Sequence, residues 1–271
     1  MLFLHIGLHK TGTTFLQQAV FPKWKGIHYI PEDKLEFLVR MDGAQDYLLS
    51  REGLSGKNWA HAEERAKNIA CLAGLFPLAK VLISFRKHSS FIVSSYKQYL
   101  QQGGYLAFED YFDLNADRGF MKQEDFLFRN KMDLVDQLFE PSPFVMLYED
   151  ITKNLAYLLP ALERYMGGTA PAVEDIKLGR RNKSVGYYPA KLLRYLNGKS
   201  FSKLNDQGKY DLYNWRLKRL GLDPRSICQY KLGFLPDRPI LNAEQLKQID
   251  NLYADDWAYI KERAASCGNA H

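Results

Sequence analysis

The sequence lacks the features that mark disulfide scaffolds, zinc proteins and membrane proteins. Its 271 residues include only three cysteines, which are widely spaced and form no Cys-x-x-Cys pair. This argues against a zinc site and a disulfide framework, and it fits a reducing compartment. The six histidines show no His-Glu-x-x-His or similar ligand spacing, so we expect no metal site. No apolar run reaches the ~18 residues that a membrane-spanning helix needs, so we expect no transmembrane segment.

A targeting segment and a dominant charge are missing as well. Residues 1–7 are apolar, but they have neither a basic start nor a small-residue cleavage site. We therefore do not interpret them as a signal peptide, and we expect a cytoplasmic protein. Lys and Arg number 37 against 31 Asp and Glu, a net charge of +6. That balance fits an ordinary soluble surface as well as an anionic ligand such as a nucleotide, a polyanionic glycan or a nucleic acid.

Short apolar runs alternate with helical patterns, and this alternation predicts an α/β fold. We expect strands over residues 2–6, 27–30, 80–85 and 144–148, and helices over 13–21, 58–76, 89–102 and 154–166, with Asn58 as an N-cap. Such an alternation implies a mostly parallel sheet with helices on both faces. The strand signal fades from Gly179 onward, and no linker or repeat interrupts the chain. We therefore predict one three-layer domain over 1–271, with a sheet core over about 1–170 and a helical C-terminal cap over about 180–271.

The most informative segment is Gly-Leu-His-Lys-Thr-Gly-Thr-Thr, residues 7–14, between the first expected strand and helix. Open α/β sheets bind ligands at the carboxyl ends of their strands, where backbone N–H groups and a helix N-terminus form an anion cradle. Gly7 and Gly12 keep the spacing of a Walker-A loop, but Thr13-Thr14 stand where Lys-Ser/Thr would follow. The cation lies inside the loop instead, as Lys10. This arrangement suits a 5′-terminal anionic group without an obligatory metal.

The stretch His-Lys-Thr-Gly-Thr-Thr resembles the 5′-phosphosulfate loop of sulfotransferases that use 3′-phosphoadenosine-5′-phosphosulfate (PAPS). The resemblance is strongest to the carbohydrate branch and its bacterial relatives, and it covers roughly residues 1–190. It implies a P-loop NTPase-like fold, PAPS as the sulfuryl donor, no required metal, and no nucleic-acid partner. The acceptor would be a hydroxyl or amine, most often of a carbohydrate or glycolipid. By position, Lys10 would stabilise charge on the leaving phosphate, and Thr11, Gly12, Thr13 and Thr14 would hold the 5′-phosphate.

Two further segments match the nucleotide motifs of that family. Arg86 ends an apolar strand and Ser94 follows eight residues later, the family's spacing for binding the 3′-phosphate. Ser95 is an adjacent candidate, and a surface arginine with an ordinary helix serine is the alternative interpretation. The basic loop over residues 179–186 is similar to the loop that closes over the nucleotide. Its candidate contacts are Arg181, Asn182 and Ser184, with an exposed basic turn as the alternative.

The acceptor proton needs a base, which adds about 10²–10⁴-fold to such a transfer. Glu52 follows a short apolar run in a Ser-x-Glu pattern, so we expect a strand to deliver its carboxylate to the sheet edge. A surface ion pair with Arg51 is the alternative, and His9 and His61 compete for the role of base. An aromatic stretch, Phe108, Tyr111, Phe112 and Phe120, lines an acceptor groove or forms helix core.

Two other functions stay open at the level of sequence. The first is a divergent P-loop kinase or NTPase that uses ATP and magnesium, with Glu149-Asp150 as the metal site, although Thr13 in place of the Walker lysine argues against it. The second is a non-catalytic binder of anionic glycan or nucleic acid, which would show salt-dependent binding without nucleotide preference. The basic residues are dispersed along the chain rather than clustered, which disfavours this second function.

Overall fold

A computed structural model describes residues 1–31, 44–176, 185–232, 234–235 and 238–269. The chain divides into two compact units. The first unit contains Met1–His88, Phe126–Arg180 and Tyr253–His271, and the second contains Ser89–Asp125 and Arg181–Leu252. Each unit is described by itself below, and the expectation of a single domain stays a prediction.

The first unit is built on a five-stranded sheet. Its strands are β1 (Leu2–His5), β2 (Ile27–Ile30), β3 (Asp46–Ser50), β4 (Lys80–Phe85) and β5 (Phe144–Leu147). They lie in the order β2-β3-β1-β4-β5, and every neighbouring pair is parallel. The α/β fold class with a mostly parallel sheet is therefore confirmed, and each expected strand is present within one residue of its predicted ends.

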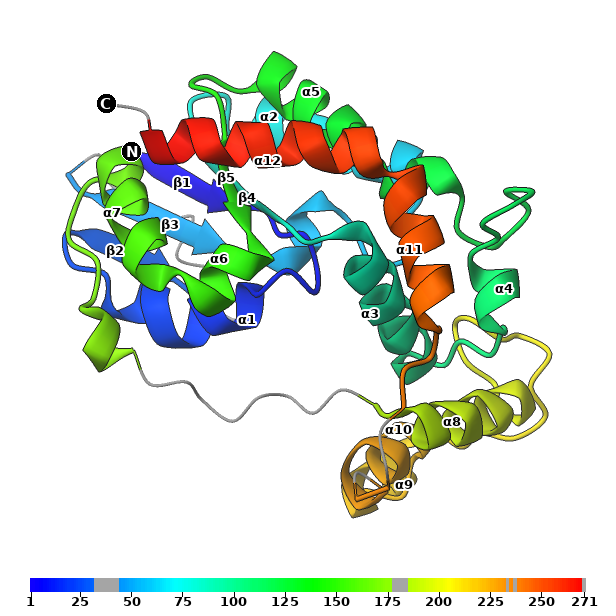
Figure 1. The fold of residues 1–271 in the computed structure, drawn as a ribbon. Coiled ribbons are helices and arrows are strands. Elements are labelled where there is room, and N and C mark those ends of the chain that lie inside the picture. The colour runs from blue at the N-terminus through cyan, green and yellow to red at the C-terminus, as the bar shows by residue number, and fades with distance from the viewer. Residues whose placement is uncertain (32–43, 177–184, 233, 236–237, 270–271) are drawn as a thin grey trace. The chain divides into compact units, whose positions relative to one another are not determined.

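Helices cover both faces of this sheet, as Figure 1 shows. The helices of the first unit are α1 (Thr13–Phe15), α2 (Ala62–Leu75), α5 (Phe128–Leu138), α6 (Tyr148–Lys153), α7 (Leu155–Met166) and α12 (Ala254–Asn269). Helices α2, α5 and α12 lie on one side, and α1, α6 and α7 lie on the other. The C-terminal helix α12 packs against β5 and contacts α5 and α7. These faces form the predicted layers.

Alternate residues of each strand are buried in opposite faces of the sheet. Phe3, Leu82 and Met146 belong to a core cluster that also holds Leu16 and Leu158 from the helices of one face. Their strand neighbours Leu4, Val81, Ile83 and Val145 are buried as well. Central strands of a parallel sheet are covered on both faces, which is why they appear in the sequence as unbroken apolar runs.

The second unit is helical in all its described elements. Its helices are α3 (His88–Gln101, whose first residue is counted with the first unit), α4 (Phe108–Tyr111), α8 (Tyr187–Lys199), α9 (Trp215–Leu220), α10 (Pro224–Ser226) and α11 (Ala243–Leu252). Its core is aromatic: the ring centroids of Tyr96 and Tyr111 lie 5.3 Å apart, and those of Tyr99 and Tyr111 lie 5.0 Å apart. Tyr111 and Phe112 are fully buried, so these two members of the predicted aromatic stretch are core.

One predicted helix boundary is wrong, and one predicted helix has a pitch that changes along its length. Helix α2 begins at Ala62 after His61, whereas Asn58 is buried and its carbonyl accepts a hydrogen bond from Arg65 Nη2 at 3.1 Å. The segment predicted as one helix over 13–21 is three turns of different pitch. These are α1, a π-helical turn over Leu16–Val20 and a 3₁₀ turn over Phe21–Lys23. Propensity does not distinguish such turns, because all three keep apolar residues on one face.

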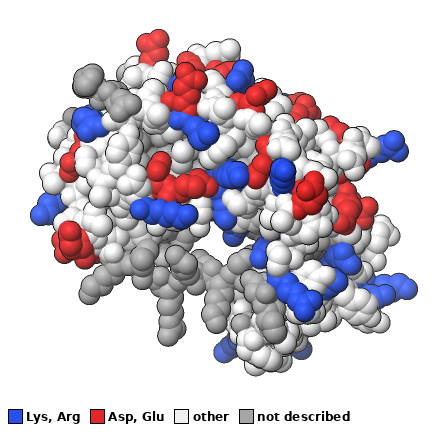
Figure 2. Space-filling view, viewed as in Figure 1, with Lys and Arg blue, Asp and Glu red and all other residues white. Residues whose placement is uncertain are grey.

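None of the helices in the described part of the chain has the length and apolar character needed to cross a bilayer. On the face drawn in Figure 2, basic and acidic side chains are interspersed over the upper part of the view, and the part at the lower right carries mainly Lys and Arg.

Candidate functional site

The candidate site is the loop that follows β1, at the point where the strand order reverses. From β1 the chain passes to β2 on one side of the sheet, and after β3 it crosses to β4 on the other side. Ligands of open α/β sheets bind outside the carboxyl ends of the strands at this switch point. Hydrogen bonds between Leu8 N and Ser84 O (3.0 Å) and between Ser84 N and Gly7 O (2.6 Å) extend the β1–β4 pairing into the loop.

The loop backbone has a shape that suits anions. Lys10 adopts a left-handed conformation with φ 64°, which is uncommon for a residue with a side chain, and Gly12 has φ 92°. The Gly12 carbonyl then accepts from Phe15 N at 3.0 Å and from Leu16 N at 3.2 Å, which starts the helical segment. Left-handed residues within such turns direct N–H groups into one concavity that binds anions. A strained residue held in this way is a common mark of a functional loop.

Thr11 supports the loop from inside rather than facing a ligand. Its side chain is fully buried, and its hydroxyl donates to Leu8 O at 2.5 Å and shares a 2.6 Å hydrogen bond with Ser84 Oγ. Ser84 Oγ also lies 3.0 Å from Gly7 O, so its single proton is shared between Thr11 Oγ1 and this carbonyl. Sequence reasoning proposed Thr11 as a phosphate contact and missed Ser84. The structure leaves the Thr11 backbone, not its hydroxyl, for that contact.

Glu52 stands at the centre of a polar cluster beside the loop. It begins a 3₁₀ turn directly after β3, and its Oε2 lies 2.8 Å from His9 Nδ1. Its Oε1 accepts hydrogen bonds from the hydroxyls of Thr13 and, at 3.4 Å, Thr14. Burial raises the pKa of Glu52, but the hydrogen bond from His9 and the charges of His9 and Lys10 outweigh it, so the pKa lies below its ordinary value. Glu52 is therefore a carboxylate at neutral pH.

His9 is held by acceptors on both ring nitrogens. Nδ1 faces the Glu52 carboxylate, and Nε2 lies 3.2 Å from the carbonyl oxygen of Gly56. Both ring nitrogens thus lie against oxygen atoms of the turn after β3, which fixes the orientation of the imidazole beside the Glu52 carboxylate. The geometry therefore favours His9 as a partner that orients Glu52.

A second polar layer behind Glu52 went unnoticed in the sequence. His5 Nδ1 lies 2.6 Å from Ser50 Oγ, and Gln17 Nε2 donates to Ser50 O at 3.1 Å. Burial lowers the pKa of His5 to about 4 against the opposing charge of Glu52, so His5 is neutral. The signal that could have revealed this layer is the histidine at the end of an otherwise apolar strand, because an uncompensated buried polar group is costly there.

Arg86 lies at the carboxyl end of β4, where the sequence placed it. Its Nη1 donates to Lys10 O at 3.3 Å, and its guanidinium stacks 4.2 Å from the Tyr148 ring centroid. Burial lowers the pKa of Arg86, while the charges of Tyr148 and Glu149 raise it. An arginine with such a shift remains charged at neutral pH. Sequence reasoning missed Tyr148 as a partner. The register Phe85↔Leu147 sets the residues that follow β4 and β5 next to each other.

The other sequence candidates lie elsewhere or outside the described residues. Ser94 is half-buried on α3 in the second unit, and Ser95 beside it is buried. His61 is exposed at the start of α2, and Glu149 and Asp150 begin α6. Glu149 Oε1 lies 3.4 Å from Lys87 N. Arg181, Asn182 and Ser184 fall outside the described residues. Among the described residues, no three His, Cys, Asp or Glu side chains gather as a metal-binding group.

No protein-family model and no curated protein matches this chain. Among solved structures, the chain is similar to the crystal structure of mouse sulfotransferase SULT7A1 complexed with PAP. That similarity has a TM-score of 0.44 and 14% sequence identity, and it covers 96% of this chain and 88% of the mouse chain.

Proposed function

We propose that this protein is a sulfotransferase that moves a sulfuryl group from PAPS to a hydroxyl or amine of a carbohydrate or glycolipid. The observation that carries the proposal is the loop over residues 7–14. This loop follows β1 at the switch point of the sheet, and its residue Lys10 has a left-handed conformation. The Lys10 carbonyl accepts a hydrogen bond from Arg86. The loop backbone is thus shaped for an anion, and the Arg86 guanidinium is held beside it.

The two anionic groups of PAPS, the 5′-phosphosulfate and the 3′-phosphate, would face Lys10 and Arg86. The 5′-phosphosulfate would lie against the loop, with the backbone of Thr11, Gly12 and Thr13 and the hydroxyl of Thr14 as donors. The 3′-phosphate would meet Arg86, whose planar fork suits two phosphate oxygens. Stacking on Tyr148 restrains the guanidinium before the ligand arrives, which lowers the entropic cost of binding. Ser94, Arg181, Asn182 and Ser184 complete the proposed nucleotide contacts.

The chemistry is an in-line displacement at sulfur. The acceptor oxygen or nitrogen forms a bond to sulfur while the bond between sulfur and the 5′-phosphate oxygen breaks, and that oxygen keeps the electron pair. Lys10 stabilises the charge that develops there, an effect typically worth several kcal/mol. The acceptor proton passes to Glu52, and the products are the sulfated acceptor and 3′-phosphoadenosine-5′-phosphate (PAP). No step in this scheme uses a metal.

Glu52 is suited to the role of base only if its hydrogen-bond partners adjust. Both of its oxygens are engaged, one by His9 and one by Thr13. A lowered pKa keeps the carboxylate ionised, but it also weakens its attraction for a proton. We propose that His9 positions Glu52 and that Thr13 yields Oε1 to the acceptor, because a hydroxyl is the weaker donor of the two.

Calorimetric titration with PAP, compared with ATP and Mg²⁺ at moderate salt, tests the donor. We expect micromolar PAP binding that Arg86→Ala weakens by at least about tenfold, since a charge-assisted contact is lost. Lys57→Ala, an exposed lysine outside the loop, is the matched control and should leave the affinity unchanged. Binding of ATP with Mg²⁺ but not of PAP would overturn the proposal in favour of a kinase.

Single-turnover assays with labelled PAPS and a panel of sugars, glycolipids and phenols test the transfer. Lys10→Ala should abolish transfer while PAP still binds, because the lysine acts on charge that develops in the transition state. Near-normal turnover by that variant would contradict the mechanism. Transfer to phenols but not to sugars would instead correct the acceptor class.

A further inference from the structure

The second unit contains a cavity of about 280 Å³ that the proposed sulfuryl transfer does not use. Residues from helices α3, α4 and α8 and from one later loop line it: Tyr96, Leu100, Phe108, Glu109, Tyr187, Ala190, Lys191, Arg194 and Ile240. All of these belong to the same unit, so the cavity is a property of that unit alone. Its volume is at the lower end of small-molecule sites, which suits a single ring rather than a chain of sugars.

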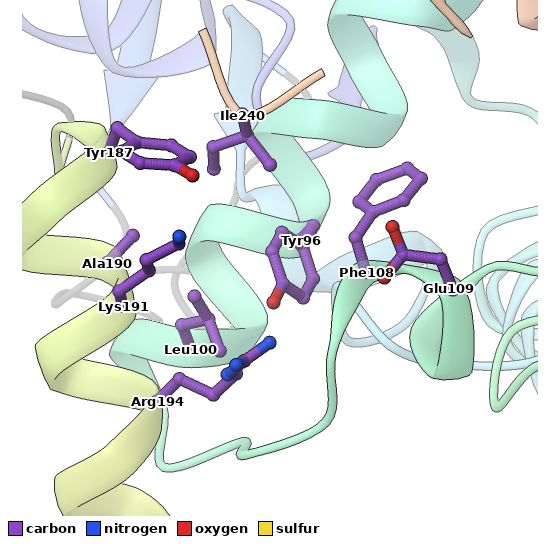
Figure 3. A pocket seen from close by; sticks show the side chains of 9 residues that line it. All are labelled: Tyr96, Leu100, Phe108, Glu109, Tyr187, Ala190, Lys191, Arg194 and Ile240. Carbon is purple, nitrogen blue, oxygen red and sulfur yellow. The ribbon is translucent and has the colours of Figure 1, made fainter. Parts of the chain in front are cut away.

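One wall of the cavity is cationic. Helix α8 presents Tyr187, Lys191 and Arg194 at positions i, i+4 and i+7, the spacing of one helix face. The Lys191 amine lies 4.5 Å from the Tyr187 ring centroid. Figure 3 shows the Lys191 and Arg194 side chains reaching from α8 into the cavity. Two neighbouring cations on one wall attract an anionic group.

The facing wall is aromatic and acidic. Tyr96 and Phe108 are buried there, and Glu109 follows Phe108 at the start of α4. Figure 3 shows the Tyr96 hydroxyl directed toward Arg194. Burial raises the pKa of Tyr96 to about 12, although Arg194 opposes the shift, so this hydroxyl stays protonated. The Glu109 carboxylate accepts hydrogen bonds only, and it therefore suits hydroxyl groups of a ligand.

Buried hydrogen bonds hold the two walls in place. Asn197, fully buried on α8, donates from Nδ2 to Leu100 O and to Gly104 O, each at 2.7 Å. Its Oδ1 accepts from the Tyr213 hydroxyl at 2.6 Å. All the polar atoms of this side chain are thereby engaged with α3, the turn after it and the loop before α9. The cavity is pre-organised, which lowers the entropic cost of binding.

We infer that this cavity binds a single hydroxylated six-membered ring that carries one carboxylate or sulfate. The anionic group lies against Lys191 and Arg194, the ring lies between Phe108 and Tyr187, and the ring hydroxyls face Glu109. The charge of the second unit agrees with an anionic ligand, because residues 89–125 and 181–252 together hold 17 Lys and Arg against 12 Asp and Glu. Both acidic pyranoses and hydroxylated aryl acids have this chemistry. The site needs no nucleotide, so it stands apart from the proposed transfer reaction.

Ligand-observed NMR and calorimetry on the full chain test the inference with D-glucuronate, 4-hydroxybenzoate and D-glucose. We expect millimolar binding of at least one acid and at least about tenfold weaker binding of glucose, which lacks the carboxylate. Arg194→Gln and Lys191→Gln should each weaken the binding of the acid by about fivefold or more. Lys199→Gln, a lysine of α8 outside the cavity, is the matched control and should bind the acid as the unmodified chain does.

Ala190→Leu provides a test that depends on volume instead of charge, because this small buried residue lines the cavity. It should abolish acid binding without changing the affinity for PAP. Preference for glucuronate identifies an acidic sugar as the ligand class, and preference for 4-hydroxybenzoate identifies an aryl acid. Equal binding of glucose and the acids overturns the inference, as does binding that survives both Arg194→Gln and Ala190→Leu. The same holds if neither acid binds at tens of millimolar. PAP binding in the same samples shows separately whether the proposed transferase function stands.

Discussion

Two threonines of the loop after β1 have different surroundings and should respond differently to the loss of their hydroxyls. Thr11→Val removes a buried hydroxyl and leaves Leu8 O and Ser84 Oγ without their partner, which costs about 1–3 kcal/mol of unfolding free energy. Thr14→Val should leave stability nearly unchanged, because Thr14 is half-buried and makes only a 3.4 Å contact with Glu52. It should weaken the binding of PAP, because the proposed contact of this hydroxyl with the 5′-phosphate is lost. Urea unfolding and calorimetry on both variants check this. Equal stability losses would contradict the assignment.

Glu52 predicts a pH dependence with a defined sign. Its pKa is lowered in the folded protein, so the ionised carboxylate contributes stability above the ordinary value of about 4.5. That contribution is lost as the pH falls through the lowered pKa. Glu52→Gln should therefore lower the unfolding free energy by about 1 kcal/mol at pH 7 and make little difference near pH 3. Denaturant unfolding at both pH values measures it, and a difference that grows on acidification would refute it.

The rate of sulfuryl transfer should report which residue takes the proton. With Glu52 as the base, the rate falls only below about pH 4.5, and His9→Asn slows the reaction and moves that limb to higher pH, because His9 lowers the pKa of Glu52. A limb in the ordinary range of histidines, about pH 6.5, would assign the proton to His9 instead.

Sequence reasoning identified both His9 and Glu52 but treated them as alternative candidates for the base. The two residues are 43 positions apart, and their hydrogen bond exists because β3 pairs with β1. Strand order cannot be deduced from the local pattern of either strand, so the contact could not be predicted. The buried hydroxyl of Thr11 was missed for the same reason, since Ser84 reaches it from β4.

At the scale of elements, one side chain within the first unit connects α12 to α5 and to His88. Helix α5 has no side-chain cap of its own, and Asp256 on α12 accepts from Phe128 N at 2.8 Å and from Arg129 N at 2.9 Å. His88 Nε2, at the start of α3, lies 3.0 Å from the same carboxylate. The imidazole is stacked between Phe128 and Tyr253, with ring centroids 4.2 and 4.4 Å away. Asp256 thus connects α12 to α5 and to His88, which follows β4 by three residues.

Asp256→Asn should lower the unfolding free energy by about 2 kcal/mol, because a buried charged acceptor of three hydrogen bonds is lost. Asp255→Asn is the matched control, since that neighbour is exposed. Burial of Asp256 raises its pKa, but His88 and the two N–H groups outweigh this, so the pKa is lowered. Burial also lowers the pKa of His88.

Both shifts mean that the unfolded chain binds more protons, so stability falls as the pH drops below about 6.5. Urea unfolding at pH 7.5 and 5.0 measures this loss, which should be larger in Asp256→Asn, because Asp256 raises the pKa of His88 and its removal lowers that pKa further. An equal or smaller loss in the variant would count against this role for Asp256.

The strands could be predicted because each is a short apolar run bounded by polar or turn residues, and burial on both faces of a parallel sheet requires such runs. The N-terminal cap of α5 could not be predicted, because its acceptor Asp256 lies 128 residues further along the chain. Asn58 shows the opposite case. It has the residue type of an N-cap, but tertiary contacts bury it and the helix begins four residues later.

At the scale of the whole molecule, each unit is assembled from separated segments. The first unit recruits α12 from the end of the chain, and the second takes residues 89–125 from between β4 and α5. Sequence reasoning groups neighbours along the chain, and therefore placed the sheet core over about 1–170 and the helices after about residue 180 in a C-terminal cap. Within the first unit, α12 contacts β5, α5 and α7, so this late helix packs on the sheet and its helices.

A chain that ends at Leu252 lacks α12 and should lose the cooperative fold of the sheet unit. It removes the Asp256 cap together with Ile260, which is fully buried, and it exposes the apolar surface of β5 and α5. Burial of one such side chain contributes about 1.5–3 kcal/mol, so the summed loss is comparable to the stability of a whole domain. Far-UV circular dichroism with urea unfolding should show no cooperative transition for this unit. A chain that ends at Asn269 keeps α12 and should unfold as the complete chain does. A normal transition in the shorter chain, accompanied by unchanged PAP binding, would mean that the segments before α3 and between α5 and α7 fold as a domain without the C-terminal helix.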